Sequence, residues 1–286
     1  MLQRLARRLS GLVCAAALVG CSSARTASPP CPPSRYRHAP PLVIAHGGGE
    51  GLAPGNTILA MQRSLAAGAD VLDLDLRMTS DGVIVARHDR DLATSTDGSG
   101  MVDEHSWAEI QKLDTRSFWT GAPIAEPVGV PSLAQVLAEF GDVRMSLEFK
   151  QSTPSMAKPL CDLLRSASAL NRVYLGGNDD AIVNQAKADC PELAIVNTIY
   201  EDLAEMRSAH DSGPQWCSPA PFEQPPYREG HFSAKDVQWA HDHGVAVYTW
   251  TVDDEKTLRA LAEAGVDGVY TRRPDIARKI FDEISG

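Results

Sequence analysis

Two alternating pairs of charged residues carry the clearest chemical signal in the sequence. Asp73 and Asp75 alternate with leucines in VLDLDL, and Glu148 and Lys150 flank a phenylalanine in LEFK. Residues two apart on a strand face the same side, so each pair projects together. Two like charges on an apolar strand are costly unless a cation lies between them. We therefore predict a cation beside the aspartates; an edge strand with solvated aspartates is the alternative.

Two histidines occupy similar places in the sequence. His46 closes the apolar run LVIAH, and His88 closes VIVARH. Together with the two charged pairs, they fall at the carboxyl ends of four predicted strands, where barrel enzymes assemble their sites. Unperturbed imidazole titrates near physiological pH, so we predict that His46 and His88 are catalytic residues that transfer protons.

The three acids of this set predict a metal site. Ca²⁺ and Mg²⁺ both prefer oxygen ligands, so Asp73, Asp75 and Glu148 are the expected metal ligands, and the sequence does not distinguish the two cations. Zn²⁺ would more readily recruit the histidines. A cation, a lysine and two imidazoles around one point suit an anionic substrate that gains charge in the transition state, such as a phosphodiester.

The elements that must position these residues alternate along the chain. Eight strands interleaved with helices favour a single-domain α/β fold, the (β/α)8 TIM barrel, and a doubly wound open sheet is the alternative. The segment HGGGEG lacks the spacing of a dinucleotide-binding fingerprint, which disfavours that alternative. The strands are predicted over 42–46, 71–77, 83–88, 144–149, 173–177, 193–198, 245–251 and 267–271, and the helices over 57–67, 106–113, 132–140, 156–169, 180–188, 201–210, 233–243, 255–264 and 274–283.

The N-terminal region differs from the rest of the chain. Residues 1–20 carry three arginines and then an apolar run too short to span a bilayer, which predicts a signal peptide. LVGC, ending at Cys21, resembles the lipobox of bacterial lipoproteins and implies a lipid anchor at Cys21 on the extracytoplasmic face of the cell envelope. A signal peptide cut elsewhere and an uncleaved anchor are the alternatives. Residues 21–40 are rich in Ser, Ala and Pro and predict a tether, and residues 41–286 form the barrel domain.

Charge and cysteine content restrict the partners. The net charge of −10 becomes −13 when the three arginines of residues 1–20 are removed, which argues against nucleic acid as a partner. In an oxidising compartment Cys31, Cys161, Cys190 and Cys217 can pair in three ways. Cys161 and Cys190 fall on successive predicted helices, which favours that pair. We expect a monomer.

Several ordered motifs resemble the glycerophosphodiester phosphodiesterase family. The stretch from Ile44 to Asp89 contains His-Gly, Pro-x-Asn-Thr, Gly-Ala-Asp, acid-x-Asp, Thr-x-Asp-Gly and His-Asp in the family's order. LEFK, YTWTVDD and GVDGVYTRRP are similar to the later blocks. The resemblance implies a barrel and the hydrolysis of a glycerophosphodiester to glycerol 3-phosphate and an alcohol.

The resemblance also implies roles for single residues. The metal ligands would be the three acids named above, the proton-transfer groups would be the two histidines, and Lys150 would contact phosphate. Two roles stay open for Trp250, which follows a predicted strand: it packs against an apolar part of the substrate, or it forms a wall of the barrel mouth.

The sequence departs from the family pattern at four positions, one of which is Asp73, a methylene shorter than the family's usual glutamate. Gly47 stands where the family has arginine, Gly55 where it has glutamate, and Arg272 where it has aspartate. A bidentate phosphate contact and an acid near the metal are thereby lost. Glu50 is a candidate replacement for the acid, and Arg87 and Arg272 are candidate replacements for the cation.

Two further functions stay open. A lysophospholipase D-like enzyme would keep the mechanism and act on lysophospholipids. A non-catalytic envelope lipoprotein would keep the barrel and bind a phosphorylated ligand, and Gly47 and Gly55 motivate this reading. The headgroup that would be released cannot be read from the sequence.

Overall fold

The computed structural model describes residues 31–177, 180–195, 203–210, 216–218 and 222–286. The predicted signal peptide, the lipobox and the first half of the predicted tether lie outside the described residues. Among the residues that are described, no helix has the length and apolar character needed to cross a membrane.

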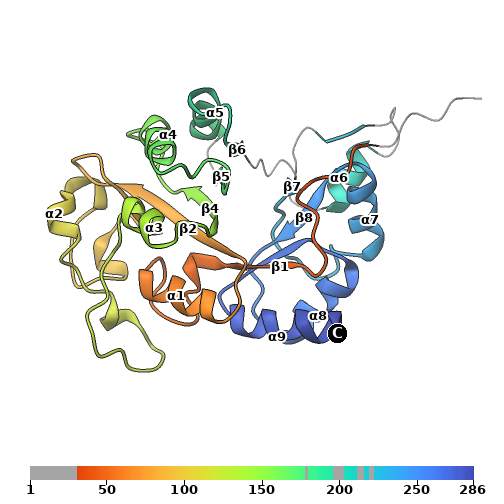
Figure 1. The fold of residues 1–286 in the computed structure, drawn as a ribbon, viewed down its shortest axis with the longest axis horizontal. Helices are drawn as coiled ribbons and strands as arrows, with labels where there is room; N and C mark the ends of the chain where they lie inside the picture. Colours follow the sequence, from red (N-terminus) through yellow and green to blue (C-terminus); the bar gives the residue numbers. More distant parts are fainter. Residues whose placement is uncertain (1–30, 178–179, 196–202, 211–215, 219–221) are drawn as a thin grey trace, which may run out of the picture.

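The described residues form nine strands, nine α-helices and four short 3-10 helices, arranged around one sheet (Figure 1). The strands are β1 (Leu42–Ala45), β2 (Val71–Met78), β3 (Ile84–Ala86), β4 (Arg144–Phe149), β5 (Val173–Gly177), β6 (Ala194–Ile195), β7 (Phe222–Glu223), β8 (Ala246–Thr249) and β9 (Gly268–Thr271). The α-helices are α1 (Ile58–Ala66), α2 (Trp107–Ile110), α3 (Leu133–Glu139), α4 (Ala157–Ser166), α5 (Asp180–Asp189), α6 (Leu203–His210), α7 (Ala234–Asp242), α8 (Glu255–Ala264) and α9 (Pro274–Ser285).

The strand order confirms the predicted (β/α)8 architecture. The sheet runs β6-β5-β4-β2-β1-β9-β8-β7, and the pairs along this path are parallel. From β1 to β6 and from β7 to β9, each strand of this path pairs with the next strand of the path along the chain, and the last strand, β9, returns to pair with β1. A doubly wound sheet would instead leave the last strand at an edge. Within the described residues, β6 and β7 are the two ends of the path.

Two strand predictions need correction, although the total of eight parallel strands is right. The predicted strand over 83–88 is β3, which pairs antiparallel with β2 in a hairpin and is no member of the parallel path. The eighth parallel strand is β7, inside a Pro- and aromatic-rich segment for which no strand was predicted. A three-residue apolar run has the same pattern in a hairpin and in a parallel sheet, so the pattern alone cannot give its direction.

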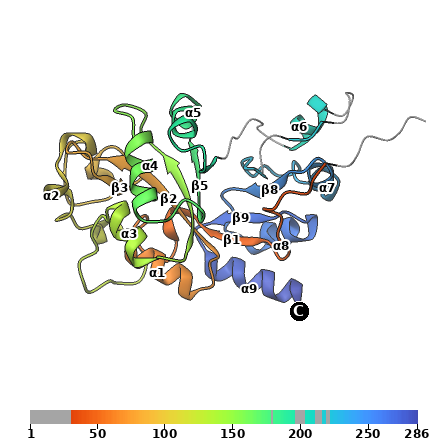
Figure 2. The ribbon, with the colours of Figure 1, turned by 45° about the horizontal axis from the view of Figure 1, so that its top comes forward.

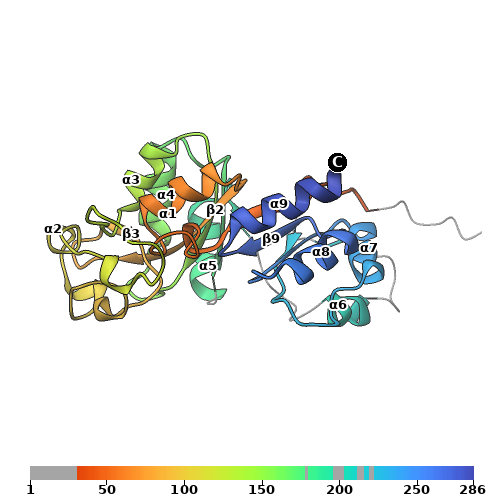
Figure 3. The same ribbon diagram turned by 90° about the horizontal axis from the view of Figure 1, so that it is seen from below.

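The two halves of the molecule follow the order of the chain. Figure 1 shows α1 to α5 around β2, β4 and β5 on one side, and α6 to α9 around β7 to β9 on the other. The turned view of Figure 2 shows the strands of both halves meeting at the centre beside β1. The segment from β3 to α3, which includes α2, extends to the end of the molecule far from the C-terminus (Figure 3).

The inward side of the strands changes character along the barrel. Near the amino ends of the strands an apolar and tyrosine-rich cluster fills the interior, including Ile44, Val71 and Tyr270. Alternation then carries the inward row of β2 from Val71 to Asp73 and Asp75. The opposite side of the strands packs on the helices in two larger apolar clusters. The interior therefore becomes acidic toward the carboxyl ends of the strands.

Two disulfides close the described part of the chain. Cys161 pairs with Cys190, as predicted from their places on successive helices, and Cys31 pairs with Cys217. The bond between Cys31 and Cys217 attaches residues 31–40 to the barrel. This segment also contacts the barrel through Tyr36, whose ring lies 5.0 Å from that of Phe222.

Candidate active site

The ladder between β2 and β4 brings the predicted acids together. Asp75 pairs in register with Glu148, and Asp73 pairs with Ser146. Partners in register on neighbouring strands face the same side, so the carboxylates of Asp73, Asp75 and Glu148 share one face of the sheet. Asp73 and Asp75 are buried, with 4% and 3% of their surfaces exposed. The alternative of an edge strand with solvated aspartates is thus wrong.

Lys150 lies between two of these acids. Its ammonium is 2.6 Å from Glu148 Oε1 and 3.3 Å from Asp75 Oδ1, the second being an ion-pair distance without hydrogen-bond geometry. Burial lowers the pKa of Lys150, but the Asp75 and Glu148 carboxylates outweigh burial and raise it. The cation that the aspartates require is therefore supplied, in part, by the chain itself.

His46 is held by the third acid. It begins a 3-10 turn directly after β1, and its Nδ1 lies 2.9 Å from Asp73 Oδ2. Burial lowers the pKa of His46, but the hydrogen bond to Asp73 and the charges of Asp73, Asp75 and Glu50 outweigh burial and raise it from 6.5 to about 9. Because Nδ1 is engaged by Asp73, Nε2 is the nitrogen left for a proton transfer.

Asn56 is a site residue that the sequence analysis did not identify. Its side chain donates to Asp75 Oδ2 at 2.8 Å and accepts from the backbone N–H of Asp75 at 3.0 Å. Asn56 has a φ of 58°, a left-handed conformation in which asparagine is enriched. The signal in the sequence was the Pro-x-Asn-Thr motif, in which Thr57 caps α1 and Asn56 remains free to hold Asp75.

His88 reaches the site by a different route from the one predicted. It follows β3, the antiparallel strand of the hairpin, and Arg87 N–H donates to Asp75 O at 2.7 Å as the chain returns. The hairpin thereby brings His88 back to the level of Asp75. The His88 ring is 59% exposed, and its Nδ1 lies 2.9 Å from Asp89 Oδ1.

A cavity of about 300 Å³ joins the two histidines. It is lined by His46 and His88 together with Glu50, Asn56 and Asp75. A neighbouring cavity of about 510 Å³, lined in part by Trp119, Asp253 and Arg272, shares Glu50 and Gly55 with the first. The two cavities give room for a small diester beside the acids.

The acids fit a hard divalent cation by chemistry but form no compact cluster. Within the described ranges, no three His, Cys, Asp or Glu side chains converge as a metal-binding group. Lys150 lies between Asp75 and Glu148 instead. Burial raises the pKa of Glu148, opposed by Lys150, and the charges of Asp73 and Asp75 add to the rise. The site therefore holds more negative charge than its own cations balance.

Of three other residues named from the sequence, Trp250 and Arg272 do not line this cavity, and Arg87 does. Trp250 follows β8, is 44% exposed, and its indole N–H donates to Gln224 O at 2.8 Å. Arg87 is buried and donates to backbone and hydroxyl oxygens of residues 89–95, so it fixes that loop and does not replace a phosphate contact. Arg272 lines the neighbouring cavity and pairs with Asp253.

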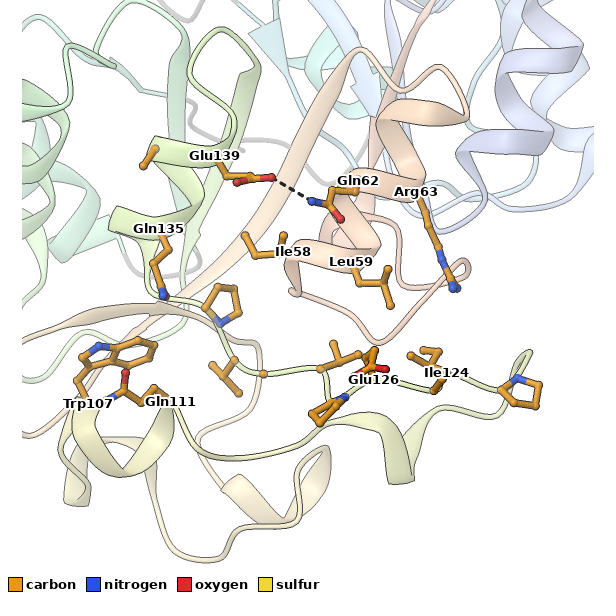
Figure 4. Close-up of a pocket in the computed structure, with 18 residues that line it drawn as sticks. Ile58, Leu59, Gln62, Arg63, Trp107, Gln111, Ile124, Glu126, Gln135 and Glu139 are labelled. Carbon is orange, nitrogen blue, oxygen red and sulfur yellow. Dashed lines mark hydrogen bonds between the residues drawn. The ribbon is translucent and has the colours of Figure 1, made fainter.

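A separate groove of about 910 Å³ lies between α1, α2, α3 and residues 123–131 (Figure 4). Apolar side chains such as Ile58, Leu59 and Ile124 line it, and a hydrogen bond of 3.0 Å from Gln62 to Glu139 crosses one wall (Figure 4). None of the seven predicted site residues lines this groove. The groove adjoins the cavity of His46 and His88, hereafter the catalytic cavity, through Val130, which lines both.

Comparison with known proteins adds to this geometry. The model of the Glycerophosphoryl diester phosphodiesterase family matches residues 46–276. A glycerophosphodiester phosphodiesterase of Bacillus subtilis is 28% identical over 256 residues, covering 84% of this chain and 86% of the relative. Among solved structures, a glycerophosphodiester phosphodiesterase from Agrobacterium tumefaciens shares the fold with a TM-score of 0.69 and 22% identity, covering 84% of this chain and 99% of that one. An Oleispira antarctica phosphodiesterase in complex with the product sn-glycerol-3-phosphate has a TM-score of 0.65 and 22% identity, covering 85% and 97%.

Proposed function

The chain belongs to the glycerophosphoryl diester phosphodiesterase family, and we propose that it hydrolyses glycerophosphodiesters to glycerol 3-phosphate and an alcohol in a metal-dependent reaction. One observation supports this most directly. A histidine oriented by an aspartate, His46 with Asp73, lies in one cavity with a second histidine, beside a lysine held between two acids. The names of the relatives support the substrate class.

The two histidines divide the proton transfers. Asp73 accepts a hydrogen bond from His46 Nδ1–H and stabilises the charged ring, so His46 Nε2–H donates to the oxygen of the departing alcohol. His88, which is more exposed, accepts the proton of the attacking hydroxyl. The attacking hydroxyl is the neighbouring hydroxyl of the substrate's glycerol, so the P–O bond to the alcohol breaks as a cyclic glycerophosphate forms. Water then opens this ring to glycerol 3-phosphate.

Charge on the phosphoryl oxygens is balanced by cations at the acids. Lys150 donates one hydrogen bond to a phosphoryl oxygen from its place between Asp75 and Glu148. Asp73, Asp75 and Glu148 would hold a divalent cation, Ca²⁺ or Mg²⁺, which when bound supplies further positive charge to the phosphoryl group. Asn56 keeps Asp75 in place during the reaction.

The test is an assay of the full chain against a panel of glycerophosphodiesters with Ca²⁺, Mg²⁺ or a chelator. We expect cation-dependent release of glycerol 3-phosphate, and we expect His88→Ala to abolish it while the thermal unfolding transition stays unchanged. Absence of release from every diester under every cation would contradict the proposal. Binding of a phosphorylated ligand by both wild type and His46→Ala, with no turnover in either, would support the non-catalytic alternative.

The groove of Figure 4 favours one second candidate function. Its apolar wall adjoins the catalytic cavity at Val130, which gives a place for an acyl chain beside the reacting phosphate. The enzyme would then act on lysophospholipids in the manner of a lysophospholipase D. Release of the headgroup from micellar lysophospholipids, but not from water-soluble diesters, would establish this function in place of the first.

We further propose that the enzyme is a monomer anchored at the cell envelope through lipid on Cys21. Support comes from the basic and apolar character of residues 1–20 and from the motif that ends at Cys21. Replacement of Cys21 by serine should move the protein from the membrane fraction to the soluble fraction. A wild-type protein that is recovered in the soluble fraction would contradict the anchor.

A further inference from the structure

Glu50 fills a space that two glycines leave beside the catalytic cavity. A Cβ added at Gly47 would lie 3.0 Å from Glu50 Oε2. A Cβ added at Gly55 would lie 2.9 Å from Glu50 Cβ and 3.1 Å from Glu50 Oε2. The carboxylate of Glu50 therefore occupies the place that side chains at 47 and 55 would otherwise approach.

The surroundings of Glu50 are those of the site. Glu50 lines the cavity together with His46, Asp75 and His88. Burial raises its pKa, the charges of His46, Arg272 and His88 lower it, and the charge of Asp75 raises it further. Glu50 is thus close enough for electrostatic interaction with both histidines. It adds a further acid to a site that already carries excess negative charge.

The backbone conformations at positions 47 and 55 are consistent with Glu50 taking the place of the family's acid at 55. Gly47 has a φ of 56°, a left-handed conformation that an arginine would adopt only with strain. Gly55 is not among the residues with positive φ, so its backbone would accept glutamate. The first obstacle to a glutamate at 55 is Glu50 itself. One residue therefore accounts for both departures from the family pattern in this loop.

We propose that Glu50 is a further acid of the active site, which binds the divalent cation together with Asp75 and replaces, from the loop after β1, the acid that Gly55 lacks. The inference deepens the proposed function and rests on its metal dependence. In this cation site the acid would come from position 50, five positions before position 55, and its carboxylate would lie where a side chain at 55 would place one.

The test is a calorimetric titration of the metal-free full chain with CaCl₂ and with MgCl₂, without substrate. We expect Glu50→Gln to weaken the bound cation at least about tenfold. The exchange Glu50→Gly with Gly55→Glu should restore affinity to within about threefold of wild type. Gly55→Glu alone should lower the unfolding temperature because of its contact with Glu50. Glu139→Gln, which removes the same charge on α3, is the control and should leave binding unchanged.

The outcomes separate the inference from its premise. Equal cation affinity of Glu50→Gln and wild type overturns the inference and leaves metal dependence in place. A wild type that binds neither cation overturns both. Failure of the folded exchange variant to regain affinity overturns the replacement of position 55. Should the exchange variant not fold, Glu50→Asp decides: affinity between those of wild type and Glu50→Gln supports Glu50 as a ligand, and affinity equal to that of Glu50→Gln overturns it.

Discussion

Besides the adjacent His88 and Asp89, the described part of the barrel contains two histidine–aspartate pairs, one at each end, and the two differ in exposure and in surroundings. At the carboxyl ends of the strands, His46 Nδ1 lies 2.9 Å from Asp73 Oδ2. At the amino ends, His241 Nε2 on α7 lies 2.7 Å from Asp267 Oδ2, directly before β9. The side chains of the first pair are 24% and 6% exposed, and those of the second are 5% and 2% exposed.

The surroundings of the two acids explain the difference. Asp267 also accepts from the backbone N–H groups of Val247 at 2.7 Å and His38 at 3.0 Å, so its carboxylate is occupied on every side and ties α7, β8 and the N-terminal segment together. Asp73 instead lies beside further acids, and its histidine faces a cavity. A surplus of charge and an accessible ring nitrogen, and not the pair itself, distinguish the site from the scaffold.

The largest expected effect separates the two pairs by activity. His46→Ala should lower kcat/KM by about 10²- to 10⁴-fold, because a positioned proton-transfer group is lost. The variant should also lose stability near neutral pH, by at most roughly 3 kcal/mol, because Asp73 loses its partner, so activity is compared per folded protein. The check is steady-state kinetics on a glycerophosphodiester together with a melting curve. Loss of activity that merely follows loss of folded protein would contradict the assignment.

The second prediction concerns the other pair, in which stability and not activity should change. His241→Ala should lower the free energy of unfolding by roughly 1–3 kcal/mol, because the buried Oδ2 of Asp267 loses the hydrogen-bond partner on α7. The specific activity of the folded fraction should stay close to that of wild type. Chemical denaturation and active-site titration measure the two quantities separately. A variant of wild-type stability with reduced turnover would break the comparison.

The comparison also shows what sequence could establish. The barrel and the predicted acids follow from local signals: alternation on β2 and β4, and helices in the expected places. The histidine at 241 has no such signal, because its partner lies 26 residues further along the chain and on another element. Only the fold brings the two together.

Other features could not be predicted from the sequence for the same reason. The place of Lys150 between Asp75 and Glu148 depends on the register of β2 and β4, in which Asp75 pairs with Glu148, and β7 is only two residues long. The hold of Asn56 on Asp75 depends on a left-handed backbone that composition does not reveal. What sequence cannot supply is thus the contact between elements, while the residue types at strand ends were sufficient to propose the chemistry.

The third prediction concerns titration of the metal-free protein. The pKa of His46 is raised above its unfolded value, so its contribution to stability is fully present below pH 6.5 and is lost as pH rises through about 9. Relative to His46→Asn, wild type should therefore lose on the order of 3 kcal/mol of stability across that window, as an upper bound. Denaturation at several pH values measures this, and an NMR titration of the ring checks the pKa. A ring that titrates near 6.5 would show that Asp73 does not hold it.

The smallest expected effect compares two helix caps, one in each region. Thr57 caps α1 at the site and Ser233 caps α7, the helix that carries His241, and each accepts a hydrogen bond from its helix at 3.2 Å. Replacing either by alanine should cost about 1 kcal/mol of stability. Thr57→Ala should also lower kcat/KM several-fold, because Thr57 adjoins Asn56 and its hydroxyl donates to Pro54 O at 2.6 Å in the loop that positions Asp75. Ser233→Ala should leave kcat/KM unchanged, since neither Ser233 nor any residue of α7 lines the cavity of the histidines or the neighbouring cavity. Equal kinetic effects of the two variants would mean that the loop before α1 is held by other contacts. Both variants lose a similar amount of helix stability, so a difference in kcat/KM between them reports only the place of the cap relative to the acids.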